Sequence, residues 1–142
     1  SNSTWRLLAG HYMDTKKFKE IKDLAPDGII VERARPDFIQ LLKNCSLSIS
    51  QGGYNTVMEV LACGANGIAI PYGGGKETEQ TLRAKLLEDR GLIKQISEEK
   101  LSDKWLVEAI NQTKNWQNNK QNNLNINGAK NTANLLASLV FK

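Results

Sequence analysis

The chain has 142 residues, of which 40% are hydrophobic, 24% charged and 6% aromatic, a composition that supports one folded domain and excludes a disordered chain. Its longest apolar stretches, around 67–72 and 135–141, fall short of the roughly 18 residues that cross a bilayer, which excludes a membrane-spanning protein. The net charge of +4 arises in residues 111–142, which hold four lysines and no acid, while residues 1–110 carry 15 basic and 15 acidic side chains; without a clustered basic face, we expect no nucleic-acid partner.

Short apolar runs alternate with segments of helical periodicity along the chain. In chain order, the pattern predicts a strand at 5–9, a helix at 14–25 with Asp14 as its N-cap, a strand at 29–32, a helix at 36–44 and a strand at 47–50. After a glycine pair it predicts a helix to about residue 63, a strand at 67–72, a helix at 77–90, a strand at 92–96 and a helix at 101–116. This alternation is typical of an α/β fold, a doubly wound parallel sheet of about five strands with helices on both faces.

The two ends of the chain differ in character from its middle. Residues 1–3 contain no methionine and are interpreted as a cloning scar, so we expect the chain to be a piece of a larger protein. Asparagine-rich sequence then divides the rest into a domain at 4–116, a polar linker at 117–127 and a C-terminal helix at 128–142. One face of this helix is apolar, and because an uncovered apolar face is an association site, we expect the helix either to fold back on its own sheet or to form a homodimer.

The strongest chemical signal follows the predicted strand at 47–50, where Gly52 and Gly53 turn the chain into a helix. Ligands of parallel sheets bind beyond the carboxyl ends of the strands. Glycines allow a ligand to approach the backbone, and the free N–H groups of a helix start bind anions; Asn55 and Thr56 add side-chain donors. The same residues also fit a tight turn with Asn55 or Thr56 as N-cap. The motif is neither GxGxxG nor a Walker A loop.

Glu59 has two interpretations. Thr56 and Glu59 have the spacing of a capping box, in which the carboxylate folds back on the Thr56 N–H. Alternatively, the carboxylate lies one turn into the helix and accepts hydrogen bonds from a ribose diol, because it offers two acceptors to adjacent hydroxyls. From the pattern alone, the capping box is favoured.

A second signal follows the strand at 67–72, where Pro71 and three glycines precede Glu79, Gln80 and the pair Arg83-Ala84. Carboxylate and amide groups suit sugar hydroxyls, which need both donors and acceptors. The alternative is an ordinary helix start enriched in acid.

These two motifs, GGYNT-xxE after one strand and EQ-xxRA after a strand that ends in Pro, resemble the C-terminal donor-binding domain of GT-B glycosyltransferases of family 28, the MurG-like group. The resemblance covers roughly residues 4–141 and is strongest over 45–91. The start at 5–10, the GGYNT form and Asn127-Gly128-Ala129 are most similar to the "predicted glycosyltransferase" branch. The resemblance implies the Rossmann-like half of a GT-B fold, without its first strand–helix unit.

The resemblance also implies a role for each matching position. The nucleotide diphosphate would be held by Gly52, Gly53, Tyr54, Asn55 and Thr56. Glu59 would bind the ribose hydroxyls, which favours that interpretation over the capping box. The backbone at Ala34 and Arg35 would contact uracil, and Glu79 and Gln80 would contact the hexose. Position 79 departs from MurG, which has glutamine there.

His11 is the only histidine, and it follows the strand at 5–9 on the expected ligand side. It is a weak catalytic candidate, and a surface or structural role is favoured. The resemblance implies that the catalytic base lies in an acceptor-binding N-terminal domain. We therefore expect the isolated chain to be inactive.

The function that the resemblance implies is an inverting glycosyltransferase that transfers a GlcNAc-like hexosyl group from a UDP-sugar. No Asp-x-Asp motif is present, and neither a metal nor a cofactor is expected. Two alternatives stay open, a non-catalytic donor-binding subunit of a two-protein glycosyltransferase and a fragment of a nucleotide-sugar 2-epimerase. The implied partners are the nucleotide sugar and either an N-terminal acceptor domain or a separate acceptor-binding subunit. Cys45 and Cys63 lack CxxC spacing and predict buried thiols in a cytoplasmic protein, peripheral to the membrane through its acceptor-binding half.

Overall fold

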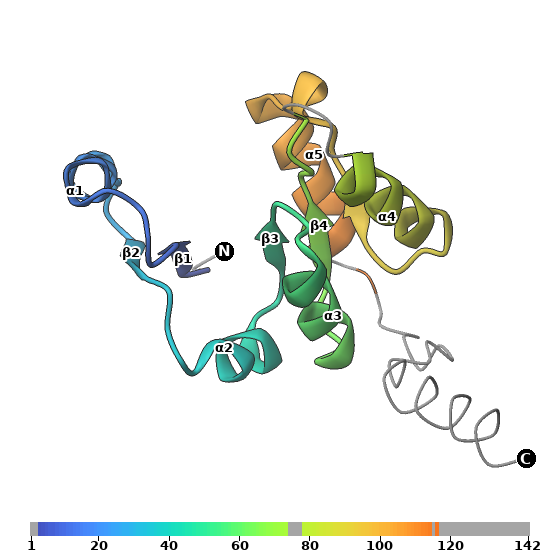
Figure 1. The fold of residues 1–142 in the computed structure, drawn as a ribbon, viewed down its shortest axis with the longest axis horizontal. Helices are drawn as coiled ribbons and strands as arrows, with labels where there is room; N and C mark the ends of the chain where they lie inside the picture. Colours follow the sequence, from blue (N-terminus) through green and yellow to red (C-terminus); the bar gives the residue numbers. More distant parts are fainter. Residues whose placement is uncertain (1–2, 74–77, 115, 117–142) are drawn as a thin grey trace, which may run out of the picture. The chain divides into compact units, whose positions relative to one another are not determined.

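The computed structural model describes residues 3–73, 78–114 and 116 (Figure 1). Strands and helices alternate, and the chain divides into two compact units, Ser1–Leu41 and Leu42–Lys142. The predicted linker at 117–127 and the C-terminal helix at 128–142 lie outside the described residues, so the homodimer through that helix stays a prediction. None of the described helices is both long enough and apolar enough to cross a bilayer.

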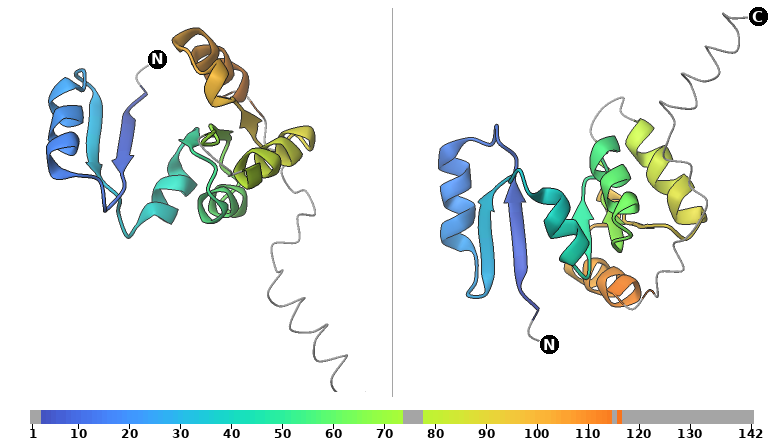
Figure 2. Two further views of the ribbon diagram at one scale, coloured as in Figure 1. Left: turned by 45° about the horizontal axis from the view of Figure 1, so that its top comes forward. Right: turned by 90° about the horizontal axis from the view of Figure 1, so that it is seen from below.

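The first unit is a parallel strand pair with its crossover helix. It consists of β1 (Trp5–Ala9), α1 (Thr15–Leu24) and β2 (Ile29–Arg33). The strands pair in parallel from Trp5 opposite Ile29 to Ala9 opposite Arg33. The Arg33 guanidinium lies 4.4 Å above the Phe18 ring, and this contact packs α1 against β2. Figure 2 shows α1 beside the two strands.

Asp14 is the N-cap of α1, as predicted. Its carboxylate accepts hydrogen bonds from the N–H groups of Lys16, at 2.9 Å, and Lys17, at 3.1 Å. We expect Asp14→Ala to lower the free energy of unfolding by about 1 kcal/mol, because two helix-start donors lose their acceptor. Urea denaturation followed by circular dichroism measures this, with Asp27→Ala in the turn before β2 as the control. A loss no larger than that of the control would contradict the capping role.

The second unit holds the other three strands. After α2 (Phe38–Asn44), which crosses the boundary between the units, its elements are β3 (Ser48–Ser50), α3 (Tyr54–Ala62), β4 (Gly67–Ala69), α4 (Thr78–Asp89), β5 (Lys94–Gln95), the 3₁₀ turn η1 (Glu98–Lys100) and α5 (Asp103–Lys114). The strand order is β3-β4-β5, and both pairings are parallel.

The buried strand β4 is covered by helices on both faces, as the doubly wound arrangement requires. On one face, Ala69 belongs to a cluster with Val57 of α3 and with Ala84 and Leu87 of α4. On the other face, Ile68 packs with two buried residues, Ile96, which follows β5, and Ala109 of α5. Figure 2 shows α3 and α4 on one side of this sheet and α5 on the other.

The α/β class, the number of strands and their parallel direction are confirmed, while two details differ from the pattern. The five described strands pair as two sheets, β1-β2 in the first unit and β3-β4-β5 in the second. The strand predicted at 67–72 ends at Ala69. Ile70 still donates its N–H to the Ser50 carbonyl, at 2.8 Å, but Pro71 has no N–H with which to continue the ladder.

Candidate donor-binding site

The turn between β3 and α3 depends on Gly52. This residue is buried and has φ +80°, a conformation that side chains with a Cβ rarely adopt. A Cβ there would lie 3.2 Å from the Ala69 Cβ. Gly52 also donates its N–H to the Ser50 Oγ, at 3.3 Å. The chain therefore passes close to β4 and emerges at the carboxyl edge of the sheet.

Gly53 begins α3 as its N-cap and leaves the helix start open. No atom would lie within 4 Å of a Cβ built on Gly53. The first intrahelical hydrogen bond runs from the Val57 N–H to the Gly53 carbonyl, at 3.0 Å. The N–H groups of the three residues between them precede this bond, so they have no acceptor within the helix. Such groups, with the positive end of the helix dipole, can bind an anion.

The capping-box alternative for Thr56 and Glu59 is wrong. The helix begins at Tyr54 with Gly53 as N-cap, and no side chain caps it, so Thr56 already lies within the first turn. Neither Thr56 nor Asn55 is the N-cap. Glu59 is half-buried, and none of the ion pairs between described residues involves its carboxylate.

Two residues of α4 approach the start of α3. The Arg83 guanidinium forms an ion pair with Glu79 one turn before it and lies 5.2 Å above the Tyr54 ring. Tyr54 is 60% exposed, so this contact lies at the surface. It brings Glu79 of the predicted hexose pair close to Tyr54 of the predicted diphosphate turn. Gln80, the other predicted hexose residue, is half-buried on α4.

The remaining predicted site residues lie in the first unit. Ala34 donates its N–H to the Ala9 carbonyl, at 2.7 Å. Any backbone contact between Ala34 and a base would therefore have to use the Ala34 carbonyl. Arg35 binds Asp37, at 2.7 Å, and Glu32, at 3.3 Å. The hydrogen bond from Arg35 lowers the pKa of Asp37, and hydrogen bonds from Arg6 first and then from Arg35 lower the pKa of Glu32. His11 is exposed in the loop after β1. The roles of His11, Ala34 and Arg35 stay predictions.

Neither cysteine forms a disulfide, as predicted, but both are half-buried rather than buried. Burial is still enough to raise the pKa of the Cys45 thiol. Among the described residues, no group of three or more His, Cys, Asp or Glu side chains could hold a metal ion.

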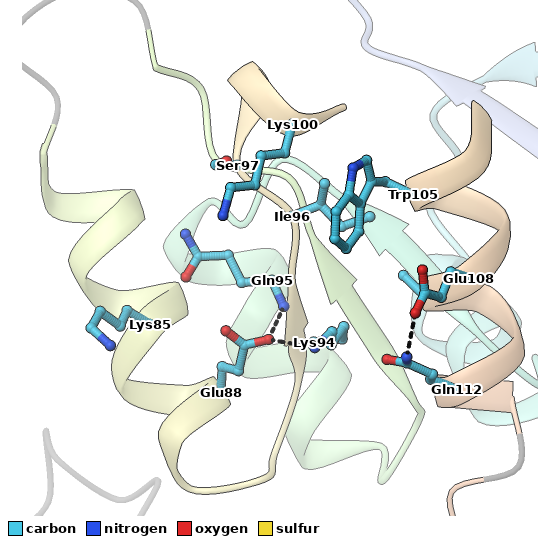
Figure 3. Close-up of a pocket in the computed structure, with 11 residues that line it drawn as sticks. Lys85, Glu88, Lys94, Gln95, Ile96, Ser97, Lys100, Trp105, Glu108 and Gln112 are labelled. Carbon is cyan, nitrogen blue, oxygen red and sulfur yellow. Dashed lines mark hydrogen bonds and ion pairs between the residues drawn. The ribbon is translucent and has the colours of Figure 1, made fainter. Parts of the chain in front are cut away.

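A separate cleft of about 370 Å³ lies between α4, β5, η1 and α5 (Figure 3). The Glu88 carboxylate on its wall accepts the Gln95 N–H, at 3.0 Å, and pairs with Lys94, at 3.2 Å. Gln112 donates to Glu108 across one turn of α5, at 3.1 Å. These bonds join polar groups of the wall to one another, and none of the predicted donor-site residues lines this cleft.

Two side chains form contacts at the carboxyl edge that the sequence pattern did not predict. Arg83 was noted only as part of a motif, and Glu98 of η1 was not noted at all. Glu98 accepts the N–H of Gly73, which follows β4, at 2.8 Å. The run Ser97-Glu98-Glu99, between the strand predicted at 92–96 and the helix predicted at 101–116, was the only available signal, and it does not indicate this contact.

Comparison with known proteins identifies the relatives of this chain. Residues 11–139 match the Glycosyltransferase family 28 C-terminal domain. An NDP-glycosyltransferase YjiC of Bacillus licheniformis is 29% identical over 114 residues, which cover 79% of this chain and 26% of that protein. A UDP-N-acetylglucosamine--N-acetylmuramyl-(pentapeptide) pyrophosphoryl-undecaprenol N-acetylglucosamine transferase of Borrelia turicatae is 29% identical over 109 residues, which cover 75% of this chain and 30% of that protein.

Solved structures show the same fold. The kitacinnamycin glycotransferase superimposes with a TM-score of 0.61 at 18% identity, over 78% of this chain and 26% of that chain. MurG of Acinetobacter baumannii superimposes with a TM-score of 0.58 at 20% identity, over 75% of this chain and 32% of that chain. The chain thus spans about a third or less of the length of these relatives. It belongs to glycosyltransferase family 28 and corresponds to the C-terminal domain of that family.

Proposed function

We propose that this chain is the donor-binding domain of a glycosyltransferase and binds a UDP-linked, GlcNAc-like hexose at the carboxyl edge of β3 and β4. The observation that carries the proposal is the open start of α3. Gly52 is held in a left-handed turn against β4, and Gly53 begins the helix with no neighbour above its Cα. A diphosphate fits this place because backbone N–H groups and the helix dipole favour negative charge.

With the diphosphate at the start of α3, the ribose and the hexose of the donor would contact neighbouring residues. Glu59, one turn further along α3, would accept hydrogen bonds from the ribose diol. Glu79 and Gln80 would contact the hexose, because Glu79 is connected through Arg83 to the Tyr54 ring at the start of α3. A carboxylate and an amide together supply the acceptors and donors that hexose hydroxyls need.

The proposed chemistry is transfer with inversion and without a metal ion. Cleavage of the anomeric bond leaves negative charge on the diphosphate, which the start of α3 can stabilise because its N–H groups are already oriented. The acceptor and its catalytic base would belong to another domain or to a separate subunit. We therefore expect the 142-residue chain to bind the donor but not to transfer its sugar.

Calorimetry with UDP, UMP, UDP-GlcNAc and GDP tests the proposal on the chain as it stands. We expect saturable binding of UDP and UDP-GlcNAc, weaker binding of UMP because it lacks the second phosphate, and no change when EDTA is present. Absence of saturable binding for every nucleotide and nucleotide sugar would refute the proposal. Loss of binding in EDTA would refute its metal-independent part.

A further inference from the structure

The end of β4 is attached to the turn after β5 by one hydrogen bond. The Gly73 N–H donates to Glu98 Oε2 at 2.8 Å. The two residues are 25 positions apart in the sequence, and both are exposed. The bond therefore joins two loops at the edge of the sheet where ligands of parallel sheets bind.

The fold delivers Glu98 to this place through the pairing of β4 with β5. Ile96 donates its N–H to the Ala69 carbonyl, at 2.9 Å, which extends the ladder by one residue beyond β5. The chain then turns into η1, where Lys100 donates to the Ser97 carbonyl, at 3.0 Å, and Leu101 to the Glu98 carbonyl, at 3.1 Å. Figure 3 shows this turn where β5 ends, above Gln95 and Ile96.

Position 73 is suited to this contact because it is glycine. A Cβ at Gly73 would lie 3.0 Å from Glu98 Oε2 and 3.8 Å from the Glu98 Cβ. The first distance is shorter than a comfortable van der Waals contact, so any larger residue would displace the carboxylate. The carboxylate is the end of a long side chain and can move aside by a few tenths of an ångström, which would lengthen and weaken the bond and leave the fold intact.

We propose that Glu98 is a positioning residue for the hexose part of the donor, an inference that rests on the proposed function. It holds the backbone at Gly73, the last described residue before α4, whose first turn carries Glu79 and Gln80. The proposed diphosphate and ribose contacts belong to the start of α3, whereas the Glu98 carboxylate binds the backbone after β4. Glu98 should therefore affect the affinity for the sugar nucleotide and leave the affinity for UDP unchanged.

The test compares UDP-GlcNAc with UDP for each variant by calorimetry. We expect Glu98→Ala to weaken UDP-GlcNAc binding about fivefold, the effect of losing one modest hydrogen bond, with UDP affinity unchanged. Glu98→Gln should restore most of the affinity, because its amide oxygen still accepts the Gly73 N–H. The control is Glu99→Ala, which removes an exposed carboxylate from the same turn. Thermal unfolding of each variant confirms that the fold is retained.

A double-mutant cycle gives an independent readout of the same contact. Gly73→Ala should weaken UDP-GlcNAc binding in the same direction as Glu98→Ala but no more strongly, and the double variant should be no weaker than Glu98→Ala alone, because both substitutions act on one interaction. Wild-type affinity for UDP-GlcNAc in the variants, additive losses, or an equal loss of UDP affinity would overturn the inference while leaving the proposed function standing. Failure of the wild-type chain to bind either ligand would overturn both.

Discussion

Replacing Ile68 with alanine is expected to lower the free energy of unfolding by about 2–5 kcal/mol, the range for large-to-small changes in a packed core. Ile68 is 1% exposed and lies on the central strand of the second unit. It packs between Ile96 and Ala109, so the cavity would lie between β4 and α5. Ile96 is held by its backbone hydrogen bond to Ala69 and Ala109 belongs to α5, so these neighbours can close the cavity only in part.

Urea denaturation of the 142-residue chain, followed by circular dichroism, measures the effect. Leu82→Ala is the matched control, because Leu82 is 59% exposed on α4 and loses a comparable apolar volume with little burial. The control should cost less than about 1 kcal/mol, as surface substitutions do. A loss for Ile68→Ala as small as that of the control would contradict the assignment of β4 to the core.

Features that depend on neighbours in the sequence could be predicted. Asp14 begins a helix because its carboxylate reaches N–H groups two and three residues away. The turn at Gly52 needs a residue that adopts positive φ, and glycine does so at little cost. Ile68 lies in an apolar run whose length and flanking glycine indicate a buried strand. In each case a local rule is sufficient.

Features that join distant, exposed polar groups could not be predicted. Arg83 lies over Tyr54, and Glu98 binds Gly73. In both pairs, the partners come from different elements, and hydrophobic periodicity carries no information about which exposed residues meet. The division of the strands into two sheets is likewise a matter of pairing, which one apolar run cannot specify by itself.

The capping-box interpretation failed for a related reason. The Thr56–Glu59 spacing is that of the motif, but the motif requires Thr56 to be the N-cap, the last residue before the helix. In the structure Gly53 is the N-cap, so α3 begins three residues earlier than the motif would require. A spacing rule applied to the sequence could not detect that the helix had already started. Because the helix begins before Thr56, the Glu59 carboxylate is not a capping group.

Substitution of Glu59 is therefore expected to affect the ligand and not the helix. We expect Glu59→Ala to weaken UDP binding by about 1–3 kcal/mol, the cost of removing hydrogen bonds to a charged group. Glu59→Gln should retain part of the affinity, because its amide oxygen still accepts one hydroxyl. The melting temperature should change little, since α3 has Gly53 as N-cap without any side-chain hydrogen bond. Calorimetry and thermal unfolding measure the two quantities on the same samples.

Comparison of UDP with 2′,3′-dideoxy-UDP isolates the contribution of the ribose. The wild-type chain should bind UDP more tightly than the dideoxy nucleotide, and Glu59→Ala should bind both equally, because the carboxylate acts through the two hydroxyls that the analogue lacks. Glu108→Ala is the control for the change in charge, since this carboxylate lies on α5 and is hydrogen-bonded to Gln112. If Glu59→Ala weakened the binding of both nucleotides to the same extent, it would still distinguish them as the wild type does, and Glu59 would not be the ribose ligand.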